Sequence, residues 1–272
     1  TLYVKYGAKY SELVYDKANA STTKVGLINA TRNGYSFAGW YTAASAGTHI
    51  TSASDVGSGV TYDSSTGEYK ITLYAHWTAL QYSVVYLKNF EDSTDSKTDT
   101  AKATFDASYT VLAVNNSQFN YDVTGWTFKG WSTTANGNVT HNPGAQVLLT
   151  NSNFSLISNN TFRLYARRNA NTYTLAYNVD GGNAIASTTK IYDTAYTAAE
   201  LPTATKAGYV FAGWYTTSAK TTKVEVGDIF TTGTATFSGT TATIYAKWTE
   251  ATDTKYTVIH YTQKLGDWTA AG

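Results

Sequence analysis

The chain carries one nine-residue segment three times, and this repetition limits its possible folds more than any other feature. Two copies are nearly identical and the middle one is looser: Gly34-Tyr-Ser-Phe-Ala-Gly-Trp-Tyr-Thr42, Gly125-Trp-Thr-Phe-Lys-Gly-Trp-Ser-Thr133 and Gly208-Tyr-Val-Phe-Ala-Gly-Trp-Tyr-Thr216. The copies begin 91 and then 83 residues apart. This spacing exceeds one turn of a solenoid, so the sequence predicts a string of small domains.

Three further signatures mark the other parts of each unit. A closing signature recurs as Leu73-Tyr-Ala-His-Trp77, Leu164-Tyr-Ala-Arg-Arg168 and Ile244-Tyr-Ala-Lys-Trp248. An opening signature recurs as Tyr82-Ser-Val-Val-Tyr86, Tyr173-Thr-Leu-Ala-Tyr177 and Tyr256-Thr-Val-Ile-His260. A second-strand signature recurs as Tyr6-Gly-Ala-Lys-Tyr10, Phe105-Asp-Ala-Ser-Tyr109 and Tyr192-Asp-Thr-Ala-Tyr196.

The order of the signatures predicts the domain organisation. A first repeat without its opening strand covers 1–79, a divergent second repeat covers 80–170, and a third covers 171–250. Residues 251–272 then contain the opening strand of a further repeat, with nothing after it.

Alternation within the signatures indicates strands. In the first central motif, aromatic and small residues alternate, as a strand over a core requires. The chain has 23 Tyr, 7 Trp and 10 Phe, and Tyr and Trp favour pleated, half-buried surfaces. We therefore expect a mainly β fold whose best helical candidate is a short turn at Thr197–Leu201. The predicted repeat core is Tyr35, Phe37, Trp40, Phe128, Trp131, Tyr209, Phe211 and Trp214.

Two positions within the motifs call for local adjustments. Gly39, which precedes Trp40, leaves room for the indole or for a β-bulge. Arg168 stands where the other two closing signatures have Trp. The second repeat should therefore seal that end of its core differently.

Together these motifs resemble the Listeria–Bacteroides repeat, the family of internalin B-type repeats. The resemblance covers nearly the whole chain, with Trp126 and Arg168 as departures from its pattern. It implies small β-grasp-like α+β units in tandem on secreted and surface proteins of bacteria, where they act as stalks, spacers or adhesive modules. It implies no catalytic residues and no cofactor.

The two ends of the chain complement each other. The first repeat lacks an opening strand, and the tail supplies one that alternates suitably: Tyr256, Thr257, Val258, Ile259, His260 and Tyr261. The second-strand aromatic residue follows the opening Tyr by 23 positions in the second repeat and by 19 positions in the third. Joining the tail of one copy to the head of another gives 22.

We therefore expect the tail strand to complete the first repeat of a second copy by strand addition, which would give a head-to-tail filament. The acceptor would be the second strand of the first repeat: Tyr3, Val4, Lys5 and Tyr6. Trp268 could anchor the joint between subunits. The alternative is that arbitrary limits were set within a longer array, so that the chain is a fragment of a spacer or stalk. The lack of Met favours a processed or excised piece of a longer product.

Composition argues against several other classes of function. The net charge is +1 and 14% of residues are charged, which argues against a nucleic-acid partner. The sequence has no apolar run long enough to span a membrane and no Cys for disulfides. The four His have no partners at metal-ligand spacing, and no nucleophile–base pair stands out, so we expect no enzyme.

Three weaker features have competing interpretations. The acidic stretch Glu91–Asp99 could ligate calcium, but a solvated loop is favoured because it lacks the EF-hand pattern. Gly181-Gly182 could cradle a phosphate, but a turn after a strand is favoured. Trp126 and Trp268 could bind glycans, which makes a glycan-binding module the competing class. The favoured hypothesis is an extracellular bacterial surface protein whose partners are copies of itself and possible host or neighbouring-cell ligands.

Overall fold

The computed structural model describes residues 2, 4, 7–13, 26–57, 59–65, 67–253 and 257–259. The described residues form twenty β-strands and three 3-10 segments, which confirms the expected mainly β fold. The chain divides into two compact units: 1–122 with 128–168, and 123–127 with 169–272. Strand pairing in the three main sheets falls within 35–79, 81–170 and 172–250.

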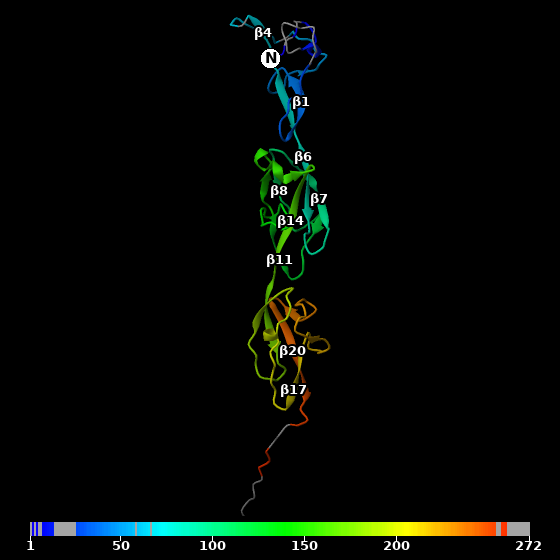
Figure 1. The fold of residues 1–272 in the computed structure, drawn as a ribbon, viewed down its shortest axis with the longest axis vertical. Coiled ribbons are helices and arrows are strands. Elements are labelled where there is room, and N and C mark those ends of the chain that lie inside the picture. The colour runs from blue at the N-terminus through cyan, green and yellow to red at the C-terminus, as the bar shows by residue number, and fades with distance from the viewer. Residues whose placement is uncertain are drawn as a thin grey trace, which may run out of the picture. The chain divides into compact units, whose positions relative to one another are not determined.

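The first repeat contains a three-stranded antiparallel sheet of order β2-β1-β5 and a separate hairpin of β3 and β4 (Figure 1). Among its described residues, the buried core consists of Tyr10, Leu13 and Val56. The elements are η1 (Tyr10–Glu12), β1 (Tyr35–Tyr41), β2 (His49–Ile50), β3 (Thr61–Asp63), β4 (Glu68–Lys70) and β5 (Tyr74–Ala79).

The second repeat is built on a mixed sheet of order β11-β14-β6-β7, in which β6 runs parallel to β14 and antiparallel to β7 (Figure 1). β13 pairs with the start of β14, and β8–β12 and β9–β10 form two further pairs. The elements are β6 (Gln81–Leu87), β7 (Ser96–Thr104), β8 (Ser108–Thr110), β9 (Asn115–Asn116), β10 (Phe119–Asn120), β11 (Trp126–Ser132), β12 (Gln146–Leu148), η2 (Asn151–Leu156), β13 (Ile157–Ser158) and β14 (Thr161–Ala170).

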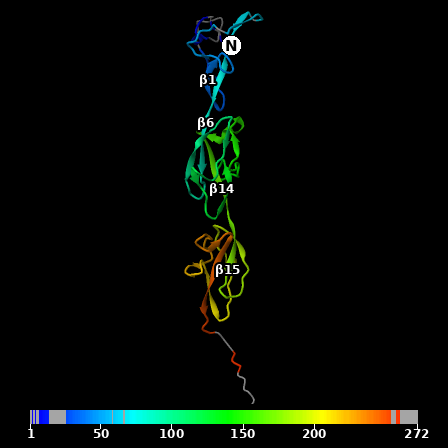
Figure 2. The ribbon, with the colours of Figure 1, turned by 180° about the vertical axis from the view of Figure 1, so that it is seen from behind.

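The third repeat has the same plan, with the order β16-β15-β20-β17-β18 and β19 paired to β20. Figure 2 labels its opening strand, β15. The elements are β15 (Thr172–Asn178), β16 (Thr188–Ile191), η3 (Ala198–Glu200), β17 (Tyr209–Tyr215), β18 (Lys223–Val224), β19 (Thr236–Ser238) and β20 (Thr241–Glu250). The predicted turn at 197–201 is η3, and a capping box between Thr197 and Glu200 begins it. The described residues contain no α-helix, so the helical part of the expected α+β units is represented there only by 3-10 segments of three to six residues.

The central Trp has the same structural role in all three repeats. The indole Nε1 donates to a backbone carbonyl of the preceding loop in each: Trp40 to Ile28 at 2.8 Å, Trp131 to Leu112 at 2.9 Å and Trp214 to Pro202 at 2.7 Å. A Phe three residues earlier packs edge-on against each indole, with ring centroids 5.1–5.4 Å apart. The motif is thus a core element that also holds a loop, since a buried indole N–H needs an acceptor.

The glycine before the central Trp sits at a β-bulge. The pairing register shifts between Phe37 and Gly39 and between Phe211 and Gly213. The two glycines have φ values of +126° and +125°, which a residue with a Cβ rarely adopts. The bulge, one of the two predicted alternatives, therefore accounts for this glycine.

Most residues of the predicted repeat core are buried or half-buried. Trp131 is 0% exposed and Trp214 is 2% exposed. Five are half-buried: Tyr35, Phe37, Trp40, Phe128 and Phe211. Tyr209 is the exception, because it is 40% exposed at the start of β17. Tyr35 packs against Phe105 of the following repeat, whereas no such ring covers Tyr209 among the described residues.

Arg168 seals the second repeat differently from Trp, as expected. In the third repeat the Nε1 of Trp248 donates to the carbonyl of Val179 at 3.0 Å. In the second repeat Nη1 of Arg168 donates to the equivalent carbonyl of Lys88 at 2.7 Å, and Nη2 donates to the carbonyl of Tyr121. Burial lowers the pKa of Arg168 below its ordinary value. The guanidinium thus reproduces the indole's hydrogen bond and adds a second.

Candidate assembly site at the joints between repeats

The first joint between repeats is a glycine turn covered by an aromatic ring of the next repeat. The N–H of Leu80 donates to the carbonyl of Gly34 at 2.9 Å, and the N–H of Phe105 donates to the carbonyl of Leu80 at 2.9 Å. Gly34 has φ +78°, and a methyl group built on it would overlap the ring of Phe105. Glycine is required at this turn both for its backbone conformation and for the close approach of the ring.

The second joint repeats this arrangement with other residues. The N–H of Asn171 donates to the carbonyl of Gly125 at 2.8 Å, and the N–H of Tyr192 donates to the carbonyl of Asn171 at 2.8 Å. Gly125 has φ +80°, and a methyl group there would overlap the ring of Tyr192. Trp126, the next residue, packs half-buried against the core of the third repeat. Trp126 is therefore a joint residue and does not offer an open platform for a sugar.

A polar contact strengthens the first joint. The ring of Tyr35 meets Phe105 edge-on with centroids 5.4 Å apart, and its hydroxyl donates to Oδ2 of Asp106 at 2.6 Å. This hydrogen bond raises the pKa of Tyr35 above its ordinary value. The guanidinium of Arg32 lies 3.9 Å from the centre of the same ring. The aromatic residue after the glycine thus connects two repeats through ring packing, a cation and a carboxylate.

The third glycine turn has the same backbone but no covering ring in the described residues. The N–H of Ala251 donates to the carbonyl of Gly208 at 3.0 Å, as in the two intact joints. Gly208 again has φ +78°, yet no described atom lies within 4 Å of a methyl group built on it. Tyr209 is 40% exposed and Val210 is 54% exposed. Half of a joint is therefore formed at this end of the third repeat.

The first repeat contains the turn that follows the joint aromatic residue in the other two repeats. Gly7 follows Tyr6 in the second-strand signature and has φ +76°, where Asp106 and Asp193 have +55° and +61°. The N–H of Gly7 donates to Val56 at 2.8 Å, as Asp106 and Asp193 donate to Leu149 and Phe230 at 2.9 Å. The turn that follows the joint aromatic residue in the other repeats thus exists after Tyr6. Tyr3, Lys5 and Tyr6 themselves lie outside the described residues, and Val4 is half-buried.

The closing strand of the first repeat is short. β14 and β20 are ten residues long, and their first five residues, from Thr161 and Thr241, pair in parallel with the opening strands β6 and β15. The closing signature aligns Lys70 with these two Thr residues. Residues 71–73 belong to no strand, and β5 begins only at Tyr74. Where an opening strand pairs in the other repeats, the described residues of the first repeat form no closing strand.

Of the predicted donor strand, residues 256–261, the structure describes only residues 257–259. Thr257, Val258 and Ile259 form no regular structure and are exposed, with Val258 at 57% and Ile259 at 65%. Tyr256, His260, Tyr261 and Trp268 lie outside the described residues. Strand addition at these residues stays a prediction.

The acidic stretch 91–99 was expected to be a solvated loop, and for Asp99 this is wrong. β7 already begins at Ser96, and Asp99 is 6% exposed. Its carboxylate accepts hydrogen bonds from Tyr109, from Gln118 at 2.7 Å and from the N–H of Ala101 at 3.0 Å. Burial alone would raise the pKa of Asp99, but these hydrogen bonds outweigh it and lower the pKa.

The other candidate residues that the structure describes do not gather into a reactive centre. The described residues contain no group of His, Asp or Glu that could hold a metal ion. Gly181 and Gly182 form a turn after β15, in which the N–H of Gly182 donates to Val179 at 2.9 Å. A methyl group on Gly182 would lie 2.7 Å from the indole of Trp248, so close packing accounts for this glycine.

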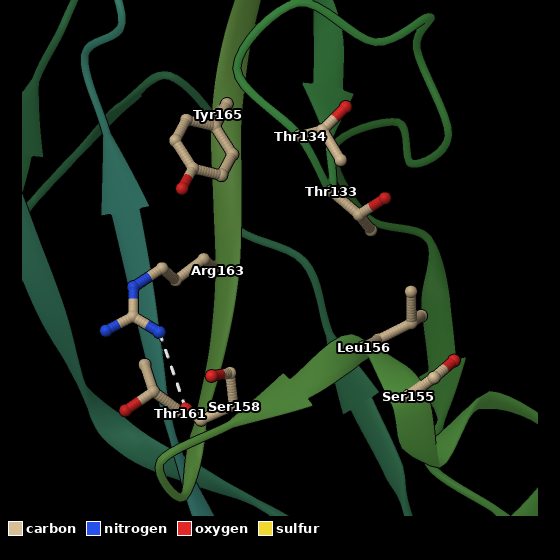
Figure 3. Close-up of a pocket in the computed structure, with 8 residues that line it drawn as sticks. All are labelled: Thr133, Thr134, Ser155, Leu156, Ser158, Thr161, Arg163 and Tyr165. Atoms are coloured by element: carbon tan, nitrogen blue, oxygen red, sulfur yellow. Dashed lines mark hydrogen bonds between the residues drawn. The ribbon is translucent and has the colours of Figure 1, made fainter.

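A pocket of about 420 Å³ opens beside β14 in the second repeat (Figure 3). Nη1 of Arg163 donates to the carbonyl of Ser158 at 3.4 Å, and Figure 3 shows this guanidinium on the side of β14 away from Thr133 and Leu156. The one charged side chain of the lining is therefore directed away from Thr133 and Leu156. The pocket is lined by Thr133, Thr134, Ser155, Leu156, Ser158, Thr161, Arg163 and Tyr165.

The joint aromatics Phe105 and Tyr192 were not among the predicted site residues. The available signal was an aromatic residue directly before Asp or Gly in the second-strand signature, since Asp and Gly tolerate positive φ. A second missed feature is the exposed pair Tyr62 and Tyr69 on the β3–β4 hairpin. These side chains are 60% and 72% exposed, with ring centroids 5.2 Å apart.

Comparisons with known proteins identify two of the repeats. The family model of the Listeria-Bacteroides repeat domain matches residues 3–76 and 173–247. A relative from Evansella cellulosilytica, named as a Gly-rich membrane protein, is 30% identical over 203 residues. The match covers 69% of this chain and 20% of the relative, so the chain spans about a fifth of that protein's length. Within the described residues, no helix combines the length and apolar character of a membrane span.

Proposed function

Because the chain belongs to the Listeria–Bacteroides repeat family, we propose that it is a non-enzymatic structural and adhesive protein of a bacterial surface. Repeats of this family are typical of surface proteins, and the name of the relative is consistent with the cell envelope. We propose further that copies join head to tail. In this arrangement the tail strand of one copy completes the first repeat of the next.

The observation that carries the proposal is the interrupted closing strand of the first repeat. The side chains of the second and third repeats that correspond to Ile71 and Leu73 are fully buried in parallel pairing with an opening strand. Ile71 and Leu73 themselves are only half-buried, and they belong to no strand. An added strand would provide the missing pairing and cover this apolar face.

We infer the register of the added strand from the pairing in the two intact repeats. Val84 pairs with Phe162, Leu175 pairs with Ala242, and all four side chains are fully buried. The opening signature aligns Val258 with Val84 and Leu175. Val258 would therefore face the core opposite Ile71 of the neighbouring copy. Ile259 would face outward, because the side chains of successive residues in a strand alternate.

This register supplies a matched pair of variants. Val258 and Ile259 are both exposed, at 57% and 65%, so Val258→Asp and Ile259→Asp should leave the isolated chain equally stable. Burying Val contributes about 1.5–3 kcal/mol, so Val258→Asp should weaken association at least about tenfold, and Ile259→Asp much less. Light scattering and negative-stain microscopy would measure assembly, with deletion of 254–272 as the reference. Equal assembly by the deletion and the unaltered chain would refute strand addition and favour a simple spacer.

A glycan-binding module is the second candidate function, and the exposed Tyr62–Tyr69 pair favours it. Neighbouring exposed rings can stack against the apolar faces of sugars. A glycan array with the full chain would test this function. Specific binding that is lost in Tyr62→Ala and Tyr69→Ala but kept in Val258→Asp would support it, and signals unchanged by the Tyr variants would contradict it.

A further inference from the structure

We propose that the Gly208 turn, residues 206–209, is a docking socket for the Tyr6–Gly7 turn of a second copy. This inference rests on the proposed head-to-tail assembly and names a contact between folded repeats, separate from the tail strand. Its occupant is an aromatic side chain placed over a glycine, as at the two joints within the chain.

The two internal joints are the precedents for the socket. In each, the glycine turn is covered by the aromatic residue of the second-strand signature of the following repeat, Phe105 or Tyr192. The turn geometry at Gly208 is the same: the N–H of Tyr209 donates to Lys206 at 3.1 Å, compared with 3.2 Å and 3.1 Å in the two joints. The socket is thus preformed and open among the described residues, and docking would need little rearrangement.

The first repeat carries the complementary turn. Tyr6 occupies the position of Phe105 and Tyr192 in the second-strand signature. Ala8, which follows Gly7, is bonded as in the third repeat: Val56 donates to Ala8 at 2.9 Å, as Phe230 donates to Thr194 at 3.0 Å. In the proposed head-to-tail assembly, the first repeat of a second copy brings this turn to the open Gly208 turn.

The socket differs from the first joint in one polar contact. Tyr35 donates to the carboxylate of Asp106, but Gly7 stands at the position of Asp106 and has no side chain to accept from Tyr209. The ammonium of Lys206 lies 4.5 Å from the centre of the Tyr209 ring, as Arg32 lies over Tyr35. The docked contact should therefore be mainly aromatic. Adding a carboxylate at residue 7 should strengthen it, because the hydroxyl of Tyr209 gains an acceptor.

The linker after the third repeat is longer than the other two. Five positions lead from Trp77 to Tyr82 and from Arg168 to Tyr173, whereas eight lead from Trp248 to Tyr256. The hydrogen bond from Ala251 to Gly208 places the added residues after the socket. They therefore leave the socket itself unchanged, and the extra length adds little entropic cost to closing the joint.

The first test blocks the socket with a methyl group. Gly208→Ala should weaken association by about tenfold or more, because the methyl group occupies the space of the incoming ring. Gly144→Ala is the matched control, since Gly144 also has φ +78° and no described atom within 4 Å of the added methyl group. Both variants carry the same backbone strain, so sedimentation velocity should show loss of assembly only for Gly208→Ala.

The second test strengthens the contact. Gly7→Asp should tighten association severalfold, because Asp adopts positive φ at the same position in the other repeats. Tyr209→Phe should remove this gain, since it lacks the donating hydroxyl. Assembly of Gly208→Ala equal to that of Gly144→Ala would overturn the socket, even where deletion of 254–272 abolishes assembly and strand addition holds. If the deletion has no effect but Gly208→Ala abolishes assembly, strand addition fails and the socket stands. A chain that stays monomeric overturns both proposals.

Discussion

Four glycines with nearly the same backbone conformation allow the contribution of the joints to stability to be isolated. Gly34, Gly125, Gly144 and Gly208 have φ values of +78°, +80°, +78° and +78°. Replacing any of them by Ala should cost about 1–2 kcal/mol, because a Cβ is strained in the left-handed region. The two that lie under a ring in the folded chain should cost more, since the methyl group also displaces that ring.

The additional cost can be worked out from the contacts at each glycine. A methyl group overlaps Phe105 at Gly34 and Tyr192 at Gly125, whereas it meets no described atom at Gly144 and Gly208. Overpacking of this kind costs about 1–3 kcal/mol. The expected losses in free energy of unfolding are therefore about 2–5 kcal/mol for the two joint glycines and about 1–2 kcal/mol for the others.

Hydrogen exchange measured by mass spectrometry is the suitable assay, because linked repeats need not unfold in a single two-state step. Peptides that cover β6 and β15, the strands directly after the two joints, should lose protection in Gly34→Ala and Gly125→Ala respectively. The same peptides in Gly144→Ala control for strain. Equal losses in all four variants would refute the stabilising role of the rings that cover Gly34 and Gly125.

Three further predictions concern buried polar groups. Lys190 is 2% exposed and its ammonium lies 2.9 Å from Oε2 of Glu200, so Lys190→Met should cost about 2–4 kcal/mol in a urea titration, and adding Glu200→Gln should recover most of it. The folded-state pKa values of Asp99 and Glu200 lie below their ordinary values. Their ionised carboxylates therefore contribute fully to the free energy of unfolding above about pH 4, and this contribution disappears as the pH falls through the folded-state pKa values. Asp99→Asn should reduce this acid sensitivity in a fluorescence titration, and an unchanged acid transition would contradict it. Arg168→Ala removes the donor to the carbonyl of Lys88 and should cost about 1–3 kcal/mol by chemical denaturation, whereas Arg168→Lys should recover little of the loss.

Local patterns in the sequence were sufficient for much of the fold. Alternation predicted strands, Thr197–Leu201 predicted a turn, and the glycine before Trp40 predicted a bulge as one of two alternatives. Each of these depends on neighbours within a few residues. The different role of Arg168 was also predictable, because the equivalent position in the other two closing signatures is Trp.

Contacts between distant segments were not predictable in the same way. Asp99 lies in an acidic stretch typical of a loop, yet it is buried because Tyr109 and Gln118 donate to it. Tyr209 has the same sequence context as Tyr35, but it is exposed because no following ring covers it among the described residues. Both outcomes depend on which residues the fold brings together. The signatures identify equivalent residues in the repeats. Whether each of these residues is buried depends on the distant residues that the fold places against it.

The parallel pairing of first and last strands governs how a repeat responds to being pulled by its ends. Five residue pairs join β15 to β20, and five join β6 to β14. Tension enters through the beginning of one strand and leaves through the end of its parallel neighbour, so it slides the two strands along each other. The backbone hydrogen bonds between them are then loaded in shear and share the load, instead of opening one after another. Each repeat with this pairing should therefore resist unfolding by a force that pulls on the two ends of the repeat.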